Sequence, residues 1–308
     1  MINLAIGIDI GGTNIRVAQV DSDGRVLKKI KRETSEDIVK NLTDAIDELI
    51  TENTAGIGIG VAGVVDSKTG VVSRSPNLPQ VEGIDFAGIL KEKYGIPVRI
   101  ENDANAAAVG EKFAGAGRRF DDFVMLTLGT GIGGGVVIDG SLLPVAAELG
   151  HITVEAKGRK CLCPNSGCLE SYASGRAIVS EVIEELERGA ESLLKGCCDG
   201  NIYKITPEDV YNYALEGDTL ARETLKNAGK YLGIGIASLV NIFSPQAVII
   251  GGGLVGAWNI LVNEAIKEAN KRAFPELMKN VEVLPAGLTD NAGVVGAASL
   301  VLYSDITR

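Results

Sequence analysis

The sequence holds a complete set of tetrahedral zinc ligands within one short stretch. His151 is the only histidine of the chain, and Cys161, Cys163 and Cys168 follow it closely. One imidazole and three thiolates form a common ligand set for structural Zn²⁺. Because four protein ligands leave no open coordination position, we expect such an ion to be structural. The alternative interpretation is three buried structural thiols.

A glycine turn interrupts the first apolar, strand-like segment at Asp9-Ile10-Gly11-Gly12-Thr13. Paired glycines let a backbone approach a ligand, and exposed N–H groups with the Thr13 hydroxyl can hold phosphate oxygens. A carboxylate beside phosphates is repulsive unless Mg²⁺ lies between them, so Asp9 would act through the metal or its water ligands. The alternative is a tight β-turn that binds nothing.

A longer glycine-rich loop runs from Gly129 to Gly135. Its glycine spacing is that of a dinucleotide-binding loop, which a helix must follow. Here the valine-rich segment 136–138 follows, and it predicts a strand. The pattern therefore disfavours a dehydrogenase and favours a second phosphate-binding loop that faces the first. Each loop would belong to one of two lobes of the protein.

Polar residues also stand where a short strand runs into an Ala-rich helix, at Glu101-Asn102-Asp103-Ala104-Asn105. In a functional interpretation, Asp103 is the base that takes a proton from a substrate hydroxyl, and Asn102 beside it orients the substrate. Aspartate is also a common N-cap residue, so capping of the helix is the alternative role for Asp103.

The strands and turns that must position these residues occur in two similar successive segments, here called rounds. Each round is a strand, a polar glycine turn and a second strand, and the second strands end at Asp21 and Asp139. This repetition predicts two lobes of related architecture. After Cys168 the chain is mainly helical. The apolar spacing predicts a strand over 56–65 and helices over 38–49, 102–113 and 292–303.

Composition and net charge limit the classes of protein to which this chain can belong. The chain has 308 residues, 45% of them hydrophobic, which suffices for a large core, and its net charge of −10 argues against nucleic acid as a partner. Residues 231–263 carry no charge, but polar and glycine breaks favour a buried helix, a turn and a strand over a membrane span. The N-terminus shows no signal-peptide pattern, so we expect a cytoplasmic protein with reduced thiols.

These motifs, in this order, resemble the ROK family of sugar kinases and sugar-responsive repressors over essentially the whole chain. The resemblance implies an α/β, two-lobed, actin-like (ribonuclease H-like) ATPase fold with sugar and ATP in the cleft between the lobes. It implies a small lobe of residues 1–112 plus 293–308, and a large lobe of residues 113–292.

The resemblance also assigns roles to individual residues. It makes Asp103 the catalytic base, and it implies ATP with Mg²⁺ and a structural Zn²⁺ as cofactors. The implied sugar-binding residues are Gly63, Asn77, Asn102, Asp103, Glu148, His151 and Glu170. The implied ATP- and phosphate-binding residues are Asp9, Gly11, Gly12, Thr13, Gly129, Thr130, Gly131, Gly133, Gly251, Gly252 and Gly253. The implied zinc ligands are His151, Cys161, Cys163 and Cys168.

Two positions depart from the family pattern, and two cysteines have no assigned role. Asn14 stands where many members have lysine, which changes the local charge but not the backbone cradle. Pro164 stands where glycine usually follows the second cysteine, and because proline fixes φ and lacks an N–H, the zinc knuckle should fold slightly differently. Cys197 and Cys198 match no motif.

Within the family, the residues favour an ATP-dependent hexokinase that phosphorylates the 6-hydroxyl of glucose. N-acetylmannosamine, N-acetylglucosamine, fructose and mannose are alternative substrates, because a few pocket residues decide between them. A repressor would carry a DNA-binding segment before the first strand, and here the strand that leads to Asp9 starts at Leu4, leaving no room for one. We expect sugar and ATP as ligands, no nucleic-acid or membrane partner, and a homodimer or higher homo-oligomer.

Overall fold

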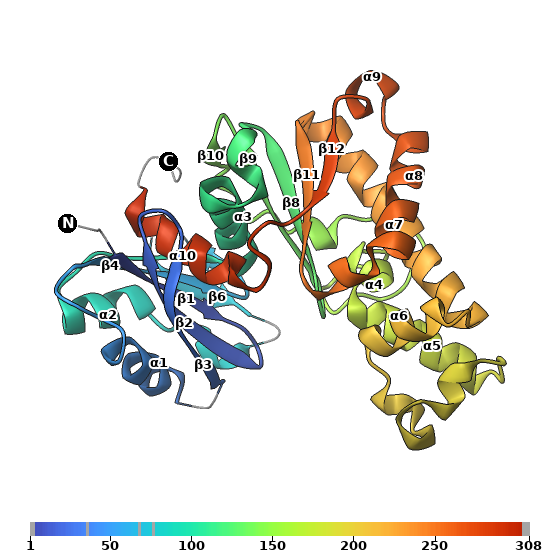
Figure 1. Cartoon of the computed structure of the whole chain (residues 1–308), viewed down its shortest axis with the longest axis horizontal. Coiled ribbons are helices and arrows are strands. Elements are labelled where there is room, and N and C mark those ends of the chain that lie inside the picture. The colour runs from blue at the N-terminus through green and yellow to red at the C-terminus, as the bar shows by residue number, and fades with distance from the viewer. Residues whose placement is uncertain (1–3, 35–36, 67–68, 76–77, 304–308) are drawn as a thin grey trace. The chain divides into compact units, whose positions relative to one another are not determined.

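The computed structural model describes residues 4–34, 37–66, 69–75 and 78–303. The chain divides into two compact units, which are described separately below. The first unit comprises Met1–Met125, Gly134–Ala147 and Ala286–Arg308, and the second comprises Leu126–Gly133 and Glu148–Pro285. Figure 1 labels the helices and strands of both units.

A five-stranded mixed sheet, in the order β3-β2-β1-β4-β7, organises the first unit. Its strands are β1 (Leu4–Ile10), β2 (Asn14–Asp21), β3 (Val26–Glu33), β4 (Thr54–Val61) and β7 (Val98–Asn102). β1, β2 and β3 are successively antiparallel, whereas β4 runs parallel to both β1 and β7. Val61 pairs with Ile10 on one side and with Asn102 on the other, so three parallel strands end together at one edge of the sheet.

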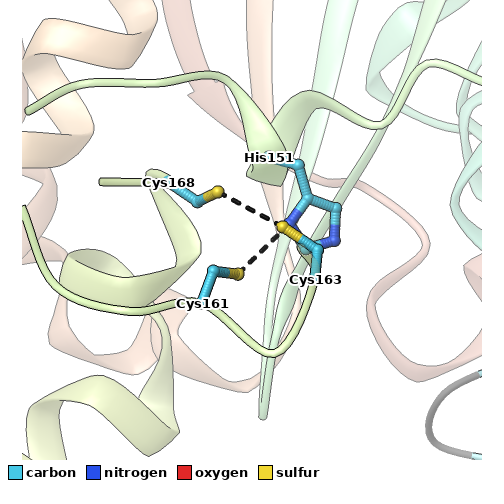
Figure 2. Close-up of side chains that lie close together, drawn as sticks. All are labelled: His151, Cys161, Cys163 and Cys168. Carbon is cyan, nitrogen blue, oxygen red and sulfur yellow. Dashed lines mark hydrogen bonds between the residues drawn. The ribbon is translucent and has the colours of Figure 1, made fainter. Parts of the chain in front are cut away.

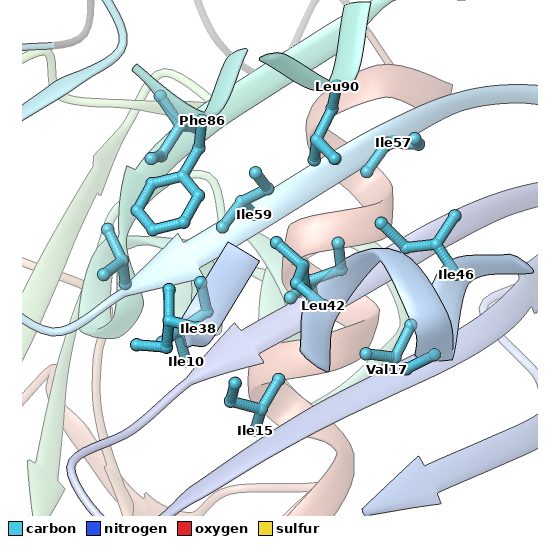
Figure 3. Packing of buried hydrophobic residues seen from close by; sticks show 14 of the residues in the cluster. Ile10, Ile15, Val17, Ile38, Leu42, Ile46, Ile57, Ile59, Phe86 and Leu90 are labelled. Atoms are coloured by element: carbon cyan, nitrogen blue, oxygen red, sulfur yellow. The ribbon is translucent and has the colours of Figure 1, made fainter. Parts of the chain in front are cut away.

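One face of this sheet packs against α1 (Ile38–Asp47) and α2 (Phe86–Tyr94). Ile38, Leu42 and Ile46 recur at helical spacing and are at most 2% exposed, so α1 buries one apolar stripe. Figure 3 shows these side chains together with residues of the strands and of α2. Asp37 and Asp85 cap the two helices by accepting hydrogen bonds from backbone N–H groups of the first turn.

The opposite face is covered by α10 (Ala292–Leu302), which also packs on α3 (Asp103–Ala114). α10 approaches so closely that a Cβ at Gly58 would lie 1.7 Å from the carbonyl oxygen of Ala297. A Cβ at Gly296 would likewise lie 1.7 Å from the carbonyl oxygen of Ala106. Glycine in β4 and α10 is therefore a packing requirement, because any side chain would push these elements apart.

The remaining strands form one further five-stranded sheet and a small hairpin. The larger sheet has the order β10-β9-β8-β11-β12. Its strands are β8 (Phe123–Leu128), β9 (Ile132–Ile138), β10 (Ser141–Leu142), β11 (Ala247–Gly251) and β12 (Glu282–Pro285), and the hairpin pairs β5 (Val64–Asp66) with β6 (Val71–Arg74). β9 contains the predicted strand 136–138 but begins earlier, at Ile132, inside the segment 129–135 that the sequence predicts as a loop.

The second unit is mainly helical, as predicted for the chain after Cys168. Its α-helices are α4 (Glu170–Ala173), α5 (Gly175–Glu187), α6 (Pro207–Leu215), α7 (Thr219–Phe243), α8 (Asn263–Arg272) and α9 (Pro275–Met278). The other helices of the chain are the short 3₁₀ segments η1 (Pro79–Val81), η2 (Ala116–Arg119), η3 (Leu149–His151), η4 (Leu193–Gly200), η5 (Ile202–Lys204), η6 (Gly253–Ala257) and η8 (Thr289–Asn291), and the π-helical η7 (Trp258–Val262).

The uncharged stretch 231–263 folds as predicted, into the end of α7, a turn and the buried strand β11. Ser244 ends α7 in a left-handed conformation, with its N–H donating to the carbonyl of Val240. Among the residues that the structure describes, no helix combines the length and apolar character needed to cross a membrane.

Candidate functional site

Asp103 lies at the edge where β1, β4 and β7 end, as the first residue of α3. Asn102, not Asp103, is the N-cap: its Oδ1 accepts hydrogen bonds from the N–H groups of Ala104 (2.9 Å) and Asn105 (3.1 Å). The capping role that the sequence allowed for Asp103 is therefore carried by its neighbour. Asp103 is half-buried, and its Oδ1 accepts a hydrogen bond from the N–H of Ala104 at 2.9 Å.

Asn102 also fixes the turn that follows β4. Its Nδ2 donates to the carbonyl oxygen of Gly63 at 2.9 Å. Gly63 has a φ of 135°, and a Cβ there would lie 2.4 Å from the carbonyl oxygen of Arg74, so only glycine fits. The side chain beside the predicted base thus ties two of the three strand ends together.

Asn105 holds a second segment against the start of α3. It is 1% exposed, and its Nδ2 donates to Oε1 of Glu101 and to the carbonyl oxygen of Val145, both at 3.1 Å. Its Oδ1 is buried, and among the described residues it has no hydrogen-bond partner. Asn105 therefore links the predicted base region to residues 142–146, which immediately precede Ala147 and Glu148.

A cavity of about 780 Å³ in the first unit opens beside these groups. Its lining includes Gly63, Glu101 and Asn102 from the strand ends, and Pro144 and Val145 from the segment that Asn105 holds. The volume falls within the range of small-molecule sites, and polar and apolar groups contribute about equally to the wall. A small polar ligand can therefore reach the region of Asn102.

Asp9 precedes the first glycine turn and is paired across the hairpin with Arg16. The Arg16 guanidinium donates to Oδ2 of Asp9 at 2.9 Å. Burial raises the pKa of Asp9, and the hydrogen bond and charge of Arg16 oppose that rise. Gly12 and Thr13 at the tip of the turn are exposed, as groups that meet a phosphate must be.

The second glycine-rich turn is fastened within the second unit. The Gly129 N–H donates to the carbonyl of Gly131 at 2.9 Å, and the Gly175 N–H donates to the carbonyl of Gly129 at 2.8 Å. The Ile132 N–H donates to Oε2 of Glu170 at 2.8 Å. A Cβ at Gly131 would lie 2.4 Å from that oxygen, so any side chain there would have to displace the Glu170 carboxylate.

The turn after β11 lies against the same loop. Gly252 has a φ of 89°, and a Cβ there would lie 2.3 Å from the carbonyl oxygen of Leu128, the residue before Gly129. Gly253, which starts η6, has open space around its Cβ position. The predicted adenosine-side turn and the predicted phosphate loop are therefore neighbours.

The predicted zinc ligands converge in the second unit (Figure 2). The potential ligand atoms of His151, Cys161, Cys163 and Cys168 all lie within 4.8 Å of one another. Two sulfurs bound tetrahedrally at about 2.3 Å lie about 3.8 Å apart, so this cluster fits one Zn²⁺. Nδ1 of His151 lies 3.6 Å from Sγ of Cys161, and Sγ of Cys163 lies 3.5 Å from Sγ of Cys168.

The orientation of His151 separates its two ring nitrogens. Nδ1 faces the cysteines, whereas Nε2 lies 3.9 Å from Oε2 of Glu148. Burial raises the pKa of Glu148, the charge of Glu170 raises it further, and His151 opposes the rise. Glu148 therefore interacts electrostatically with both His151 and Glu170.

Cys161 and Cys168 of the cluster differ in the pKa of their thiols. Burial raises the pKa of the Cys161 thiol, but hydrogen bonds with Cys163 and Ser171 outweigh it and lower the pKa to about 7. Burial and hydrogen bonds with the other two cysteines raise the pKa of Cys168 to about 12. Zinc must therefore displace the proton of Cys168 when it binds.

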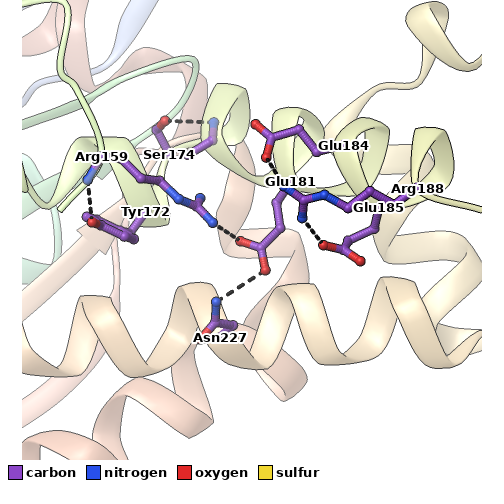
Figure 4. Close-up of polar contacts among 9 residues, drawn as sticks. Arg159, Tyr172, Ser174, Glu181, Glu184, Glu185, Arg188 and Asn227 are labelled. Carbon is purple, nitrogen blue, oxygen red and sulfur yellow. Dashed lines mark hydrogen bonds and ion pairs between the residues drawn. The ribbon is translucent and has the colours of Figure 1, made fainter. Parts of the chain in front are cut away.

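Arg159 fastens the knuckle, residues 155–168, to the helices (Figure 4). Its guanidinium lies 5.0 Å from the ring centroid of Tyr172 and donates to Glu181 on α5 at 3.1 Å. Asn227 on α7 donates to the other oxygen of Glu181 at 3.2 Å. The Arg159 N–H also donates to the Tyr172 hydroxyl at 2.7 Å. The position of the zinc ligands thus depends on packing far along the chain.

The structure places the predicted site residues in two groups, one in each unit. The first unit brings together Asp9, Gly11, Gly12, Thr13, Gly63, Asn102 and Asp103. The second unit holds Gly129, Thr130, Gly131, Gly133, Glu148, His151, Glu170, the three knuckle cysteines, Gly251, Gly252 and Gly253. Asn77 lies outside the described residues.

The sequence reasoning missed Arg16, Asn105 and Arg159. Arg16 could have been found from the hairpin, because equal steps back from the glycine turn place it opposite Asp9. Asn105 could have been found from its spacing of three residues after Asn102, which puts both at the start of one helix. Nothing in the local sequence marks Arg159, whose partner Glu181 lies on α5.

Comparisons with known proteins find matches over nearly the whole chain. The ROK family model matches residues 5–304. The chain is 38% identical over 306 residues to a glucokinase from Thermotoga maritima, covering 96% of each chain. It is 33% identical to a xylose repressor from Caldicellulosiruptor bescii, covering 96% of this chain but 77% of the repressor.

A solved structure is similar over the same extent. The crystal structure of a ROK family glucokinase from Streptomyces griseus, in complex with glucose and AMPPNP, matches with a TM-score of 0.84 and 37% identity. The match covers 96% of this chain and 98% of that one. The α/β fold is thus the two-lobed, actin-like ATPase fold that the sequence predicts. This chain belongs to the ROK family.

Proposed function

We propose that this chain is an ATP-dependent glucokinase, which transfers the γ-phosphoryl group of ATP to the 6-hydroxyl of glucose. Relatives named glucokinase at 36–38% identity support a sugar kinase. The observation that carries the proposal is the place of Asp103, which begins α3 at the meeting point of three strand ends. Asn102 carries the capping, so capping alone does not account for an aspartate at position 103.

In this proposal, Asp103 accepts the proton of the 6-hydroxyl as the O–P bond forms, and Asn102 orients the sugar. Glu148, Glu170 and Nε2 of His151 hydrogen-bond other sugar hydroxyls. Phosphoryl transfer has a loose transition state, so positioning and charge neutralisation are the main tasks of the protein. Mg²⁺, when bound, neutralises part of the phosphate charge, and Asp9 is the residue suited to hold it or its waters.

The backbone turns supply the remaining nucleotide contacts. The exposed tip at Gly12 and Thr13 offers N–H groups and a hydroxyl to phosphate oxygens. The loop from Gly129 to Gly133 offers a second set, and Gly252 and Gly253 line the adenosine side. Zn²⁺ bound by Nδ1 of His151 and the three cysteines would keep Nε2 as the nitrogen that faces the sugar.

The second candidate is a sugar-responsive repressor, because xylose repressors are 33% identical to this chain. A coupled ADP-release assay separates the candidates. MgATP with glucose should give the highest kcat/KM among glucose, mannose, fructose, N-acetylglucosamine and N-acetylmannosamine. A higher kcat/KM for another sugar would keep the kinase and change the substrate. Sugar binding without turnover of any of the five would favour the repressor.

The cellular compartment and the oligomeric state form part of the same proposal. The kinase would work in the cytoplasm, where reduced thiols can hold zinc, and would assemble as a homodimer or higher homo-oligomer without a nucleic-acid partner. Light scattering of the purified chain, with and without glucose, measures the assembly directly. A monomer at all concentrations would contradict the proposed homo-oligomer and leave the proposed activity unaffected.

A further inference from the structure

Two adjacent cysteines and an aspartate converge in the second unit, away from the zinc knuckle. Sγ of Cys197 lies 3.2 Å from Sγ of Cys198. The potential ligand atoms of these two residues and Asp209 all lie within 4.8 Å of one another. We propose that Cys197, Cys198 and Asp209 form a second metal site, which binds a thiophilic divalent cation of the Zn²⁺ class.

The backbone of η4 brings both thiols to the same side. Cys197 is extended, with φ −65° and ψ 150°, whereas Cys198 and Asp199 are both left-handed, with φ values of 53° and 57°. A left-handed conformation costs a non-glycine residue about 1–2 kcal/mol. Two in succession are therefore a strained arrangement, and the strain has a use if it presents two thiolates to one ion.

Asp209 would supply the third protein ligand. It lies in the first turn of α6, where the N–H and the hydroxyl of Thr206 both donate to its Oδ2, at 2.8 and 2.6 Å. These bonds leave Oδ1 as the metal ligand. Outer hydrogen bonds that fix a ligating side chain are a regular feature of protein metal sites.

The sulfur separation favours a metal over a disulfide. Two thiolates bound tetrahedrally to zinc lie about 3.8 Å apart, so the present 3.2 Å must widen by only about 0.6 Å. A disulfide has a bond of about 2.05 Å, so the sulfurs would have to close by more than about 1 Å. Closing the ring between adjacent residues would also twist the intervening peptide bond, which resists rotation.

An ion bound here would hold in place the connecting segment between α5 and α6, residues 188–206. The beginning of this connecting segment is already held in place, because the Ser192 hydroxyl and the Leu193 N–H donate to Oδ2 of Asp218 at 2.8 and 2.6 Å. Metal bound to the pair and to Asp209 would fasten its later part to α6. Three protein ligands leave the fourth position to water.

Zinc titration of the metal-free, reduced full-length protein tests the proposal. Calorimetry should show two equivalents of Zn²⁺ bound by the wild type and one by the Cys197→Ser/Cys198→Ser variant. The matched control, Cys161→Ser/Cys163→Ser, removes two knuckle thiols and should also bind one equivalent. Asp209→Asn should keep two equivalents and weaken one of them at least tenfold. The Cys197→Ser/Cys198→Ser variant should keep kcat within twofold of the wild type.

Thiol alkylation read by mass spectrometry gives a second measurement that does not depend on variants. Zn²⁺ should slow the alkylation of Cys197 and Cys198 by iodoacetamide at least tenfold in the wild type. One equivalent of zinc in the wild type, with the pair alkylated equally fast with and without the ion, would overturn the proposal. That outcome would leave the knuckle and the kinase activity untouched, since neither uses these residues.

Discussion

Replacing Glu170 by alanine should weaken the binding of both substrates, because this carboxylate contacts the proposed phosphate loop and is itself a proposed sugar-binding residue. Its Oε2 accepts the hydrogen bond of the Ile132 N–H at 2.8 Å. A hydrogen bond to a charged group contributes about 1.5–3 kcal/mol. At about 1.4 kcal/mol per factor of ten, kcat/KM for ATP should fall about 10- to 150-fold.

The measurement is steady-state kinetics with ATP varied at saturating glucose, and then with glucose varied at saturating ATP. Glu170→Gln keeps a neutral acceptor of the same shape and should lose less than Glu170→Ala. Glu184→Ala, on the exposed part of α5, removes only a surface ion pair with Arg188 and should leave both constants within twofold. An unchanged kcat/KM for ATP in Glu170→Ala, with only the glucose constant affected, would refute the link through Ile132.

Three further predictions concern the metal, the packing and the charge of Asp9. Removing zinc with a chelator, or replacing Cys163 by alanine, should raise the KM for glucose and lower Tm, as read by kinetics and calorimetry; an unchanged KM would mean that zinc does not position His151. Gly58→Ala should destabilise the fold by about 3 kcal/mol or more in urea unfolding, because its Cβ would lie 1.7 Å from the Ala297 carbonyl oxygen; Gly256→Ala, with open space around its Cβ, is the control. Because burial raises the pKa of Asp9, its contribution to stability is present below the unfolded pKa of 3.8 and is lost as the pH rises through the folded pKa. The Tm of Asp9→Asn minus that of the wild type should therefore increase from pH 4 to pH 7. A decrease would contradict the raised pKa of Asp9 in the folded protein.

The sequence was most informative where local chemistry and regular spacing agree. Apolar residues at helical spacing predicted α1, and the valine-rich run after the glycine loop predicted β9. The histidine and three cysteines predicted a cluster that the fold does assemble. In each of these cases the signal is contained in a few neighbouring residues, so no long-range packing is needed to read it.

Where the prediction was incomplete, the cause was competition between neighbours or contact across long distances. The strand predicted over 56–65 is two strands, β4 and β5, because Gly63 takes a positive φ that lets Asn102 bond its carbonyl. Asn102 and Asp103 are both good capping residues, and only the backbone shows which of them caps. The contacts of Arg159 with Glu181, and of Glu181 with Asn227, depend on how the helices pack, which spacing does not reveal.

The most direct test of the central claim is single-turnover phosphoryl transfer by Asp103→Asn with MgATP and glucose at saturation. The variant keeps the shape of the side chain and the Asn102 cap, so its melting temperature should match that of the wild type. If Asp103 is the general base, the rate of glucose 6-phosphate formation should fall by about 10²- to 10⁴-fold while glucose still binds. A rate within threefold of the wild type would show that Asp103 does not take the proton.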